Sequence, residues 1–266
     1  MIGLFLGDTD FSEIVLNKIK KQNIKYFIID FSKKSKFKRD KNSFRISIGK
    51  FGTIINIIKQ KKCKKVLFAG KIAKPNFSSL RLDFKGFYYM PSVIRAAKIG
   101  DAAIIKSIIN ILDNEGIKVI SSLYFNPELS LKKGNYSKFK PNKKDLVSIK
   151  KGKVYFNKTK SLDHVQAIVV KEDKIYAKEG REGTKKMLSK LKKKTGGILI
   201  KLPKKKQDLR MDLPTIGLQT FKDIKKYGLR GVVLQSKKNI FLDKTECIKF
   251  ANKNKIFINI IWKKYS

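Results

Sequence analysis

Short apolar segments alternate with amphipathic segments along the first half of the chain, and this alternation limits the fold more than any other feature. Ile2 to Leu6 is an apolar run of strand length, Phe11 to Ile19 has apolar residues at helical spacing, and Tyr26 to Ile29 is a second apolar run. A strand, a helix and a strand in this order form a βαβ unit. The pattern therefore predicts an α/β fold that opens on a parallel sheet.

The same pattern continues to about residue 125. The further elements expected in this half are a strand at Ile46 to Ile48, a helix at Phe51 to Lys61, a strand at Val66 to Ala69, a helical stretch at Pro91 to Glu115 and a strand at Ile117 to Tyr124. Gly100 interrupts the helical stretch, and Asp101 is expected to be the N-cap of its second piece. Residues 1–125 are thus expected to form an open, mostly parallel, Rossmann-like α/β domain.

Periodicity fails between Asn126 and Pro141, where Pro, Gly, Ser, Asn and Lys predominate, and this composition predicts a linker over residues 126–141. A second α/β domain is expected over residues 142–266. Its expected elements are a helix at about 142–158, strands at Val165 to Val170, Ile175 to Ala177, Ile198 to Ile200 and Ile256 to Ile261, and a helix at Thr184 to Leu191.

No apolar stretch approaches the ~20 residues that span a bilayer, and no apolar signal segment follows Met1. We therefore expect a cytoplasmic protein. Cys63 and Cys247 lie far apart without a CxxC motif, so we expect both to be small buried apolar residues.

The charge of the chain is strongly one-sided, with 63 Lys and Arg residues against 21 Asp and Glu, a formal net charge of +42. Since neutralisation of phosphates drives nucleic-acid binding, a basic RNA-binding module is one alternative function. The excess, however, is mostly Lys spread through every segment, and an RNP-like motif and aromatic stacking platforms are missing. We expect a solvated surface, part of which meets anionic lipid or phosphate, and no specific nucleic-acid partner.

A single histidine, His164, excludes whole mechanisms. One imidazole cannot build a histidine-rich dinuclear phosphoesterase site, and we expect His164 to be a structural residue at the head of a strand. The sequence also lacks a P-loop and a G-x-G-x-x-G motif. Carboxylates, lysines, arginine and backbone amides remain, a set that suits phosphoryl chemistry assisted by Mg²⁺.

One cluster, Glu179 to Thr184, stands between an expected strand and an expected helix. Its glycines permit a tight turn, Thr184 is expected to cap the helix, and the amides at the start of that helix can receive a phosphate. A helix entry with a surface ion pair explains the same spacing equally well.

A second cluster runs from Lys201 to Gly217. Pro214 favours an extended Leu213 and so holds Asp212 at a fixed angle ahead of the next helix. A carboxylate held in this way is a candidate Mg²⁺ ligand, with Asp208 as a second carboxylate and Arg210 as a bidentate phosphate contact.

Three runs of residues resemble the LpxI-type UDP-2,3-diacylglucosamine pyrophosphatase family: MPSVIRAAKIGDAAIIKSIINILDNEGIKVI, EGREGTKKML and QDLRMDLPTIGLQTF. Weaker similarity covers IGKFGTIINIIKQKKCKKVLFAGKIAKPNF and the GLRGVV to INII tail, so the resemblance extends in order over nearly the whole chain. The turn from Gly7 to Asp10, Val165 and Lys185 depart from the family pattern.

The resemblance implies two α/β domains with the active site in the cleft between them, the C-terminal domain being catalytic. It also implies hydrolysis of UDP-2,3-diacylglucosamine to UMP and 2,3-diacylglucosamine 1-phosphate in lipid A biosynthesis, with Mg²⁺ or Mn²⁺ and with water attacking the sugar-side phosphorus. The essential aspartate of the family falls on Asp212. The candidate metal ligands are Asp212, Asp208 and Glu182. The candidate substrate-binding residues are Arg210, Lys201, Gln166, Gly183, Thr184 and Thr215.

A UDP-sugar transferase that uses the same nucleotide pocket is the second alternative function, and it would release UDP rather than UMP. The partners expected for the hydrolase are the UDP-diacylglucosamine substrate and, at the basic surface, anionic lipid of the inner membrane. The sequence leaves a homodimer open.

Overall fold

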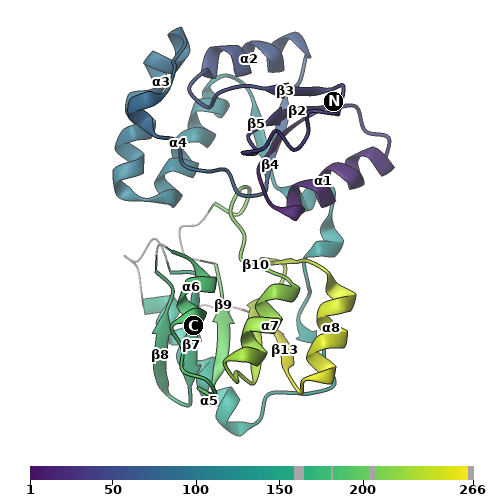
Figure 1. Ribbon diagram of the computed structural model, residues 1–266, viewed down its shortest axis with the longest axis vertical. Coiled ribbons are helices and arrows are strands. Elements are labelled where there is room, and N and C mark those ends of the chain that lie inside the picture. The colour runs from purple at the N-terminus through teal and green to yellow at the C-terminus, as the bar shows by residue number, and fades with distance from the viewer. Residues whose placement is uncertain (159–164, 181, 204–207, 263–266) are drawn as a thin grey trace. The chain divides into compact units, whose positions relative to one another are not determined.

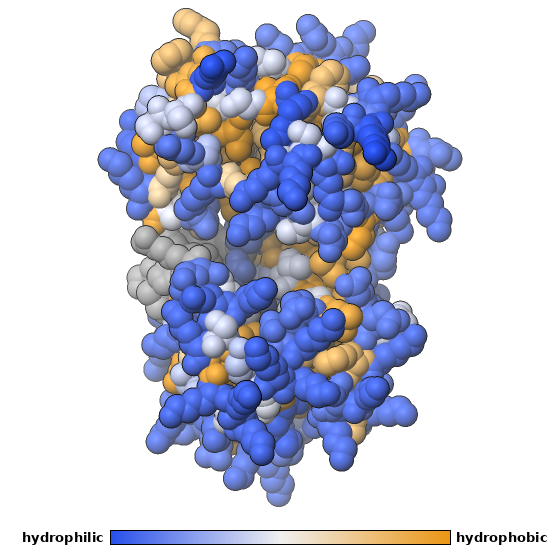
Figure 2. Space-filling view, in the orientation of Figure 1, coloured by the Kyte–Doolittle hydropathy of each residue, from blue (hydrophilic) through white to orange (hydrophobic). Residues whose placement is uncertain are grey.

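The computed structural model describes residues 1–158, 165–180, 182–203 and 208–262, and the chain divides into two compact units, Met1–Pro127 and Glu128–Ser266 (Figure 1). His164, expected at the head of a strand, lies outside the described residues. None of the described helices is long and apolar enough to cross a membrane. Hydrophilic side chains cover most of the face shown in Figure 2.

Unit 1 is built around a parallel sheet. Its elements are β1 (Ile2–Leu6), α1 (Asp10–Lys21), β2 (Tyr26–Asp30), β3 (Ser43–Arg45), α2 (Phe51–Gln60), β4 (Lys65–Ala69), η1 (Phe77–Ser79), α3 (Phe84–Ile99), α4 (Asp101–Asn114), β5 (Lys118–Ile120) and η2 (Ser122–Tyr124). The described strands pair in parallel in the order β3-β2-β1-β4-β5, and every residue of the central β1 is buried. This order confirms the expected open, Rossmann-like sheet.

The prediction of a strand at Ile46 to Ile48 is wrong, because the strand in this region, β3, ends before Ile46. The last pair of its ladder joins Arg45 to Asp30, the residue at which β2 ends, so the next residue has no partner to pair with. The apolar alternation runs on past the end of the pairing, and Ile46 and Ile48 are half-buried outside the strand.

The N-cap expected at Asp101 is also wrong. Gly100 holds that position with φ 152°, a conformation that favours glycine, and Asp101 is the first residue of α4, its carboxylate 2.5 Å from Lys74 Nζ. The preceding helix, α3, begins seven residues earlier than expected because Asp83 caps it by accepting a hydrogen bond from the amide of Gly86.

Of the strand expected at Ile117 to Tyr124, only the first half is a strand, β5. Its second half is the 3₁₀ helix η2, because the hydroxyl of Ser121 accepts a hydrogen bond from the amide of Leu123 at 3.2 Å and so caps the turn.

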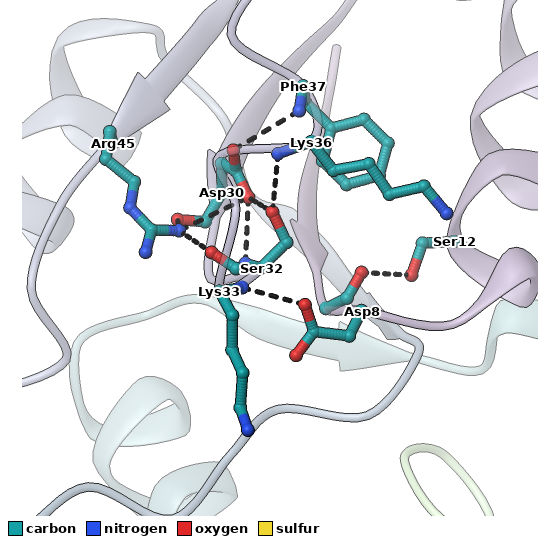
Figure 3. A network of polar contacts seen from close by, with 9 residues as sticks. Asp8, Ser12, Asp30, Ser32, Lys33, Lys36, Phe37 and Arg45 are labelled. Carbon is teal, nitrogen blue, oxygen red and sulfur yellow. Dashed lines mark hydrogen bonds and ion pairs between the residues drawn. The ribbon is translucent and has the colours of Figure 1, made fainter.

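Polar contacts hold the loops at the carboxyl edge of the sheet in unit 1 (Figure 3). The hydroxyl of Ser12 donates to the carbonyl of Gly7 at 2.9 Å. The buried carboxylate of Asp30 accepts hydrogen bonds from the amide of Ser32 at 2.8 Å and from its hydroxyl at 2.6 Å. Arg45 Nη1 donates to the carbonyl of Asp30 at 2.9 Å. These contacts fix the direction of the Arg45 side chain.

Unit 2 contains a mixed sheet. After η3 (Pro127–Leu129), its elements are β6 (Gly134–Asn135), α5 (Lys143–Lys158), β7 (Ala167–Lys171), β8 (Lys174–Lys178), α6 (Thr184–Ser189), β9 (Ile198–Lys201), β10 (Thr215–Ile216), α7 (Leu218–Lys226), β11 (Gly231–Gln235), β12 (Ile240–Phe241), α8 (Lys244–Lys253) and β13 (Phe257–Ile261). The main sheet of the described residues has the order β6-β13-β11-β9-β7-β8, with β13, β11 and β9 parallel and the other three antiparallel to their neighbours. Both units are therefore α/β, as expected.

The inner strands of the main sheet of unit 2 are buried on both faces. Along β7, Ala167 and Val169 belong to one apolar cluster, whereas Ile168 and Val170 belong to another. The helices α6, α7 and α8 supply the first cluster and α5 supplies the second, so helices cover both faces. The two cysteines of the chain are free and buried, as expected.

Candidate active site

Three neighbouring strands of unit 2 bring polar side chains to one edge of its sheet. Because β7 is antiparallel to both β8 and β9, the start of β7 lies beside the ends of the other two. Gln166 precedes β7, Glu179 follows β8 and Lys201 ends β9, so these three residues come together. This is the carboxyl edge of the parallel strands β9, β11 and β13, the edge where open α/β sheets bind ligands.

Asp212 is joined to this group through Gln166. Gln166 Nε2 donates a hydrogen bond to Asp212 Oδ2 at 2.8 Å. The main chain of Gln166 is held on both sides, since its amide donates to Glu179 Oε2 at 2.9 Å and its carbonyl accepts from the amide of Leu202 at 3.1 Å. A side-chain amide on a backbone fixed in this way has a defined direction, so Gln166 orients the carboxylate of Asp212.

The ammonium group of Lys201 lies in a polar cage. Lys201 Nζ donates to Thr184 Oγ1 and to the carbonyl of Thr215, each at 3.0 Å. Burial lowers the pKa of Lys201, and the carboxylates of Glu179 and Asp212 act in the opposite direction. The carboxylates thus compensate the desolvation of this ammonium, as a buried cation requires.

Glu179 belongs to the cluster from Glu179 to Thr184, but the sequence assigned it no role in the site. Its buried carboxylate accepts hydrogen bonds from Thr184 Oγ1 at 2.5 Å and from the amide of Gln166, so it ties the start of α6 to the start of β7. The signal was present in the sequence, because residues two apart in a strand share a face. Ala177 and Glu179 therefore share one side of the strand, the side on which Ala177 packs against the cluster of Ala167 and Val169.

The turn before α6 differs from the expectation that Thr184 caps the helix. Gly183 is the N-cap with φ 88°, and Thr184 is the first helical residue. Its hydroxyl is engaged by Glu179 and Lys201, so it does not serve the helix amides. Glu182 stands outside the network, with its exposed carboxylate 3.2 Å from Lys190 Nζ.

Asp208 and Arg210 bind each other in the loop that carries Asp212. Arg210 Nε donates to Asp208 Oδ1 at 3.0 Å, and Nη2 donates to Oδ2 at 2.8 Å. These bonds lower the pKa of the Asp208 carboxyl against the opposing effect of its partial burial. The amide of Asp212 donates to the carbonyl of Asp208 at 3.1 Å. The pair therefore stiffens the turn that leads into Asp212.

The network thus unites five of the residues singled out from the sequence. These are Gln166, Thr184, Lys201, Asp212 and Thr215. The part of the chain that the structure describes has no group of three or more His, Cys, Asp or Glu side chains that could hold an ion. Mg²⁺ commonly uses only one or two carboxylates together with substrate phosphates and water. The single oriented carboxylate of Asp212 fits that mode of binding.

The folds and this network define the class of the protein, a two-unit α/β protein whose second unit carries a carboxylate and a buried ammonium at the carboxyl edge of its sheet. The family model of the LpxI N-terminal domain matches residues 1–129, and that of the LpxI C-terminal domain matches residues 132–259. The chain is 30% identical over 223 residues to the UDP-2,3-diacylglucosamine pyrophosphatase LpxI of Caulobacter vibrioides. The aligned region covers 80% of each of the two chains. The chain belongs to the LpxI family.

Proposed function

We propose that this chain hydrolyses UDP-2,3-diacylglucosamine to UMP and 2,3-diacylglucosamine 1-phosphate, a step of lipid A biosynthesis. The observation that carries the proposal is the similarity to the Caulobacter pyrophosphatase over 80% of the chain. We propose that the reaction takes place in the cytoplasm, at the inner face of the membrane, because the acyl chains of the nucleotide sugar hold this substrate in a bilayer. A second copy of the chain, forming a homodimer, stays a prediction that light scattering tests.

Asp212 is the proposed catalytic residue. Its orientation by Gln166 supports a role in holding Mg²⁺ or Mn²⁺, or in positioning the attacking water. Asp208 and Glu182 are the further candidate ligands. When bound, the ion supplies positive charge to the pyrophosphate as negative charge develops on it.

The cations of the site are proposed to neutralise the substrate. Lys201 presents an amino group held in place by Thr184 and Thr215, and Arg210 presents a guanidinium held in a defined direction by its bond to Asp208. The amide of Thr184, the first residue of α6, is proposed to receive a phosphate oxygen, whereas the amide of Gly183 donates to the carbonyl of Gly180 at 3.1 Å. Gln166 and Thr215 would position the groups that touch the substrate.

In the proposed direction of attack, the oxygen of water bonds to the sugar-side phosphorus. The bond from that phosphorus to the bridging oxygen breaks, and UMP departs with the bridging oxygen, while the water gives its proton to solvent or to a carboxylate of the site. Water at the uridine-side phosphorus would yield the same two products, so only an isotope distinguishes the two routes.

The test is hydrolysis of UDP-2,3-diacylglucosamine in ¹⁸O-labelled water with Mg²⁺, followed by mass spectrometry of both products. We expect UMP without label and 2,3-diacylglucosamine 1-phosphate with one ¹⁸O. Label in UMP would reverse the direction of attack. Release of UDP would assign the chain to the transferases, and no turnover of this substrate by the folded protein would overturn the proposed function.

A further inference from the structure

We propose that one corner of unit 1 docks on an anionic phospholipid bilayer. Aromatic side chains at the start of α3 enter the interface, and a basic cavity beside them binds a lipid phosphate. This inference goes beyond the proposed hydrolysis, and its test uses no nucleotide-sugar substrate, so the two can fail separately.

The first feature is a stripe of exposed aromatic side chains on α3. Phe84, Phe87 and Tyr88 are 90%, 68% and 76% exposed, and their spacing places them on one side of the helix. The other side of α3 is buried through Met90 and Val93, where the helix packs against α2 and α4. Figure 2 shows apolar side chains at the surface in the region where Figure 1 labels α3. Large exposed apolar groups gathered on one helix face mark an interaction surface.

The second feature is a basic cavity of about 500 Å³ in the same unit. Its lining includes the cations Arg45, Lys50 and Arg81 and the hydroxyl residues Ser47, Thr53 and Ser79. The lining residues include no Asp or Glu, and the carboxylate of Asp83 lies next to the cavity, where it accepts a hydrogen bond from the hydroxyl of Thr53 at 3.1 Å. Guanidinium, ammonium and hydroxyl groups around one space are the groups that bind a phosphate ester.

Two of the three cations of the cavity are available to an anion. Arg45 Nη1 donates to the carbonyl oxygens of Asp30 and Ser32 and lies 3.5 Å from the carboxylate of Asp30, which partly compensates its charge and holds the half-exposed side chain in place (Figure 3). Within the described parts of the chain, neither Lys50 nor Arg81 forms an ion pair with a carboxylate, and both are exposed. A bound phosphate would therefore meet a net positive site.

Asp83 fixes the cavity and the aromatic stripe relative to each other. Its carboxylate accepts hydrogen bonds from the amides of Gly52 at 3.0 Å and Thr53 at 2.8 Å, at the start of α2, and from the amide of Gly86 at 2.8 Å, at the start of α3. Thr53 lines the cavity, and Phe84 follows Asp83 directly. The two features therefore form one corner of the unit, which we call the α3 corner.

A bilayer fits the α3 corner better than other occupants. Aromatic rings settle at the headgroup level of membranes, and anionic lipid attracts the basic residues around them. A second copy of the chain would bring the same charge of +42 to the contact, and like charges oppose association. Single-stranded RNA stacks on aromatic rings that line a groove, whereas these rings stand on the outer face of a helix.

The main test measures sedimentation of the full chain with vesicles of phosphatidylcholine alone and of phosphatidylcholine mixed with phosphatidylglycerol. The aromatic variant is Phe84→Ser with Phe87→Ser and Tyr88→Ser, which leaves the charge unchanged. Its control is Tyr124→Ser, which removes a side chain that is 64% exposed outside the stripe. We expect the aromatic variant to bind the mixed vesicles about tenfold more weakly, because burial of the rings in the interface is lost. The control should match the unaltered chain.

A second pair of variants separates the cavity from general charge. Lys50→Gln with Arg81→Gln removes two charges from the cavity. Lys21→Gln with Lys64→Gln removes two exposed charges, at the end of α1 and directly before β4, on the opposite edge of the sheet. We expect the cavity variant to weaken binding about tenfold and the distant variant to have a smaller effect. Circular dichroism verifies that each variant is folded.

Several results would overturn the proposal. Equal vesicle binding by the aromatic variant and the unaltered chain would reduce the effect to general electrostatics. Equal weakening by the two charge variants would reject the cavity. A change of oligomeric state in light scattering, with vesicle binding unaffected, would make a second copy the occupant. If the aromatic variant lost binding to oligouridylate but kept vesicle binding, the partner would be RNA.

Discussion

Glu115, the residue that follows α4, joins three helices of unit 1 through one carboxylate. It lies 2.7 Å from Lys59 Nζ of α2, and it accepts hydrogen bonds from Lys85 Nζ and from the hydroxyl of Tyr89, at 2.8 Å, both on α3. Burial disfavours its ionised form, but the three hydrogen bonds outweigh burial and lower the pKa of Glu115 from 4.5 to about 2. We expect Glu115→Gln to loosen the helices that carry the α3 corner.

The magnitude follows from the lowered pKa. A carboxyl whose pKa falls from 4.5 to about 2 contributes about 3 kcal/mol when ionised, at about 1.4 kcal/mol for each pH unit. The side chains of Lys59 and Lys85 are 54% and 36% exposed, so solvent screens the pairs and about 1–3 kcal/mol is the expected loss. Since the folded pKa is the lower one, this stability is complete above pH 4.5 and is lost as the pH falls towards 2.

The assay is hydrogen exchange of peptides from α2, α3 and α4 at increasing urea concentrations, at pH 7 and at pH 3, for the unaltered chain and for Glu115→Gln. Peptide resolution reports the free energy of opening of these helices even where the two units unfold separately. At pH 3, about 2 kcal/mol of the largest expected difference should have disappeared. The control is Tyr89→Phe, which removes one donor and should cost about 1 kcal/mol.

A difference below about 0.5 kcal/mol at pH 7 would show that the screened lysines contribute nothing measurable. A difference of the same size at pH 3 and pH 7 would refute the assignment to an ionised carboxylate, because the protonated side chain resembles the Gln that replaces it.

Three further predictions concern the candidate active site. Asp212→Asn should lower turnover by about three powers of ten while circular dichroism stays unchanged; a folded variant with a near-normal rate would make Asp212 a structural residue. EDTA should abolish turnover, and added Mg²⁺ or Mn²⁺ should restore it; full activity in a sample shown to be free of metal would contradict this. Glu179→Gln should destabilise unit 2 by about 2 kcal/mol in urea, because the buried ammonium of Lys201 loses a compensating charge, and an unchanged unfolding midpoint would count against the cage around Lys201.

The sequence determined the parallel core of unit 1 because a strand buried on both faces must be apolar throughout. The run Ile2 to Leu6 has no polar residue, and all of it is buried in β1. The single histidine of the chain excluded a histidine-rich dinuclear site by composition alone. Pro214 and the charges around it predicted Asp212 and Arg210 as candidate site residues, because the chemistry of a turn depends on residues that are close in the sequence.

Local pattern was a poor guide where an element ended. Ile46 and Ile48 continue the alternation of β3, yet the strand stops at Arg45 because its neighbour β2 stops at Asp30. Likewise, Asp101 has the chemistry of a cap, but the conformation of Gly100 gives the cap position to the glycine. In both cases the outcome depends on pairing or backbone geometry that the pattern of side chains does not contain.

The candidate site depends on contacts between distant parts of the chain. Gln166 reaches Asp212 across 46 residues, and Lys201 reaches Thr184 across 17. The sequence supplied these residue types, but only the antiparallel pairing of β7 with β8 and β9 places them at one edge of the sheet. Glu179 became a partner of the network for the same reason, because the register of the strands, which is set by packing of the whole sheet, decides which side chains meet.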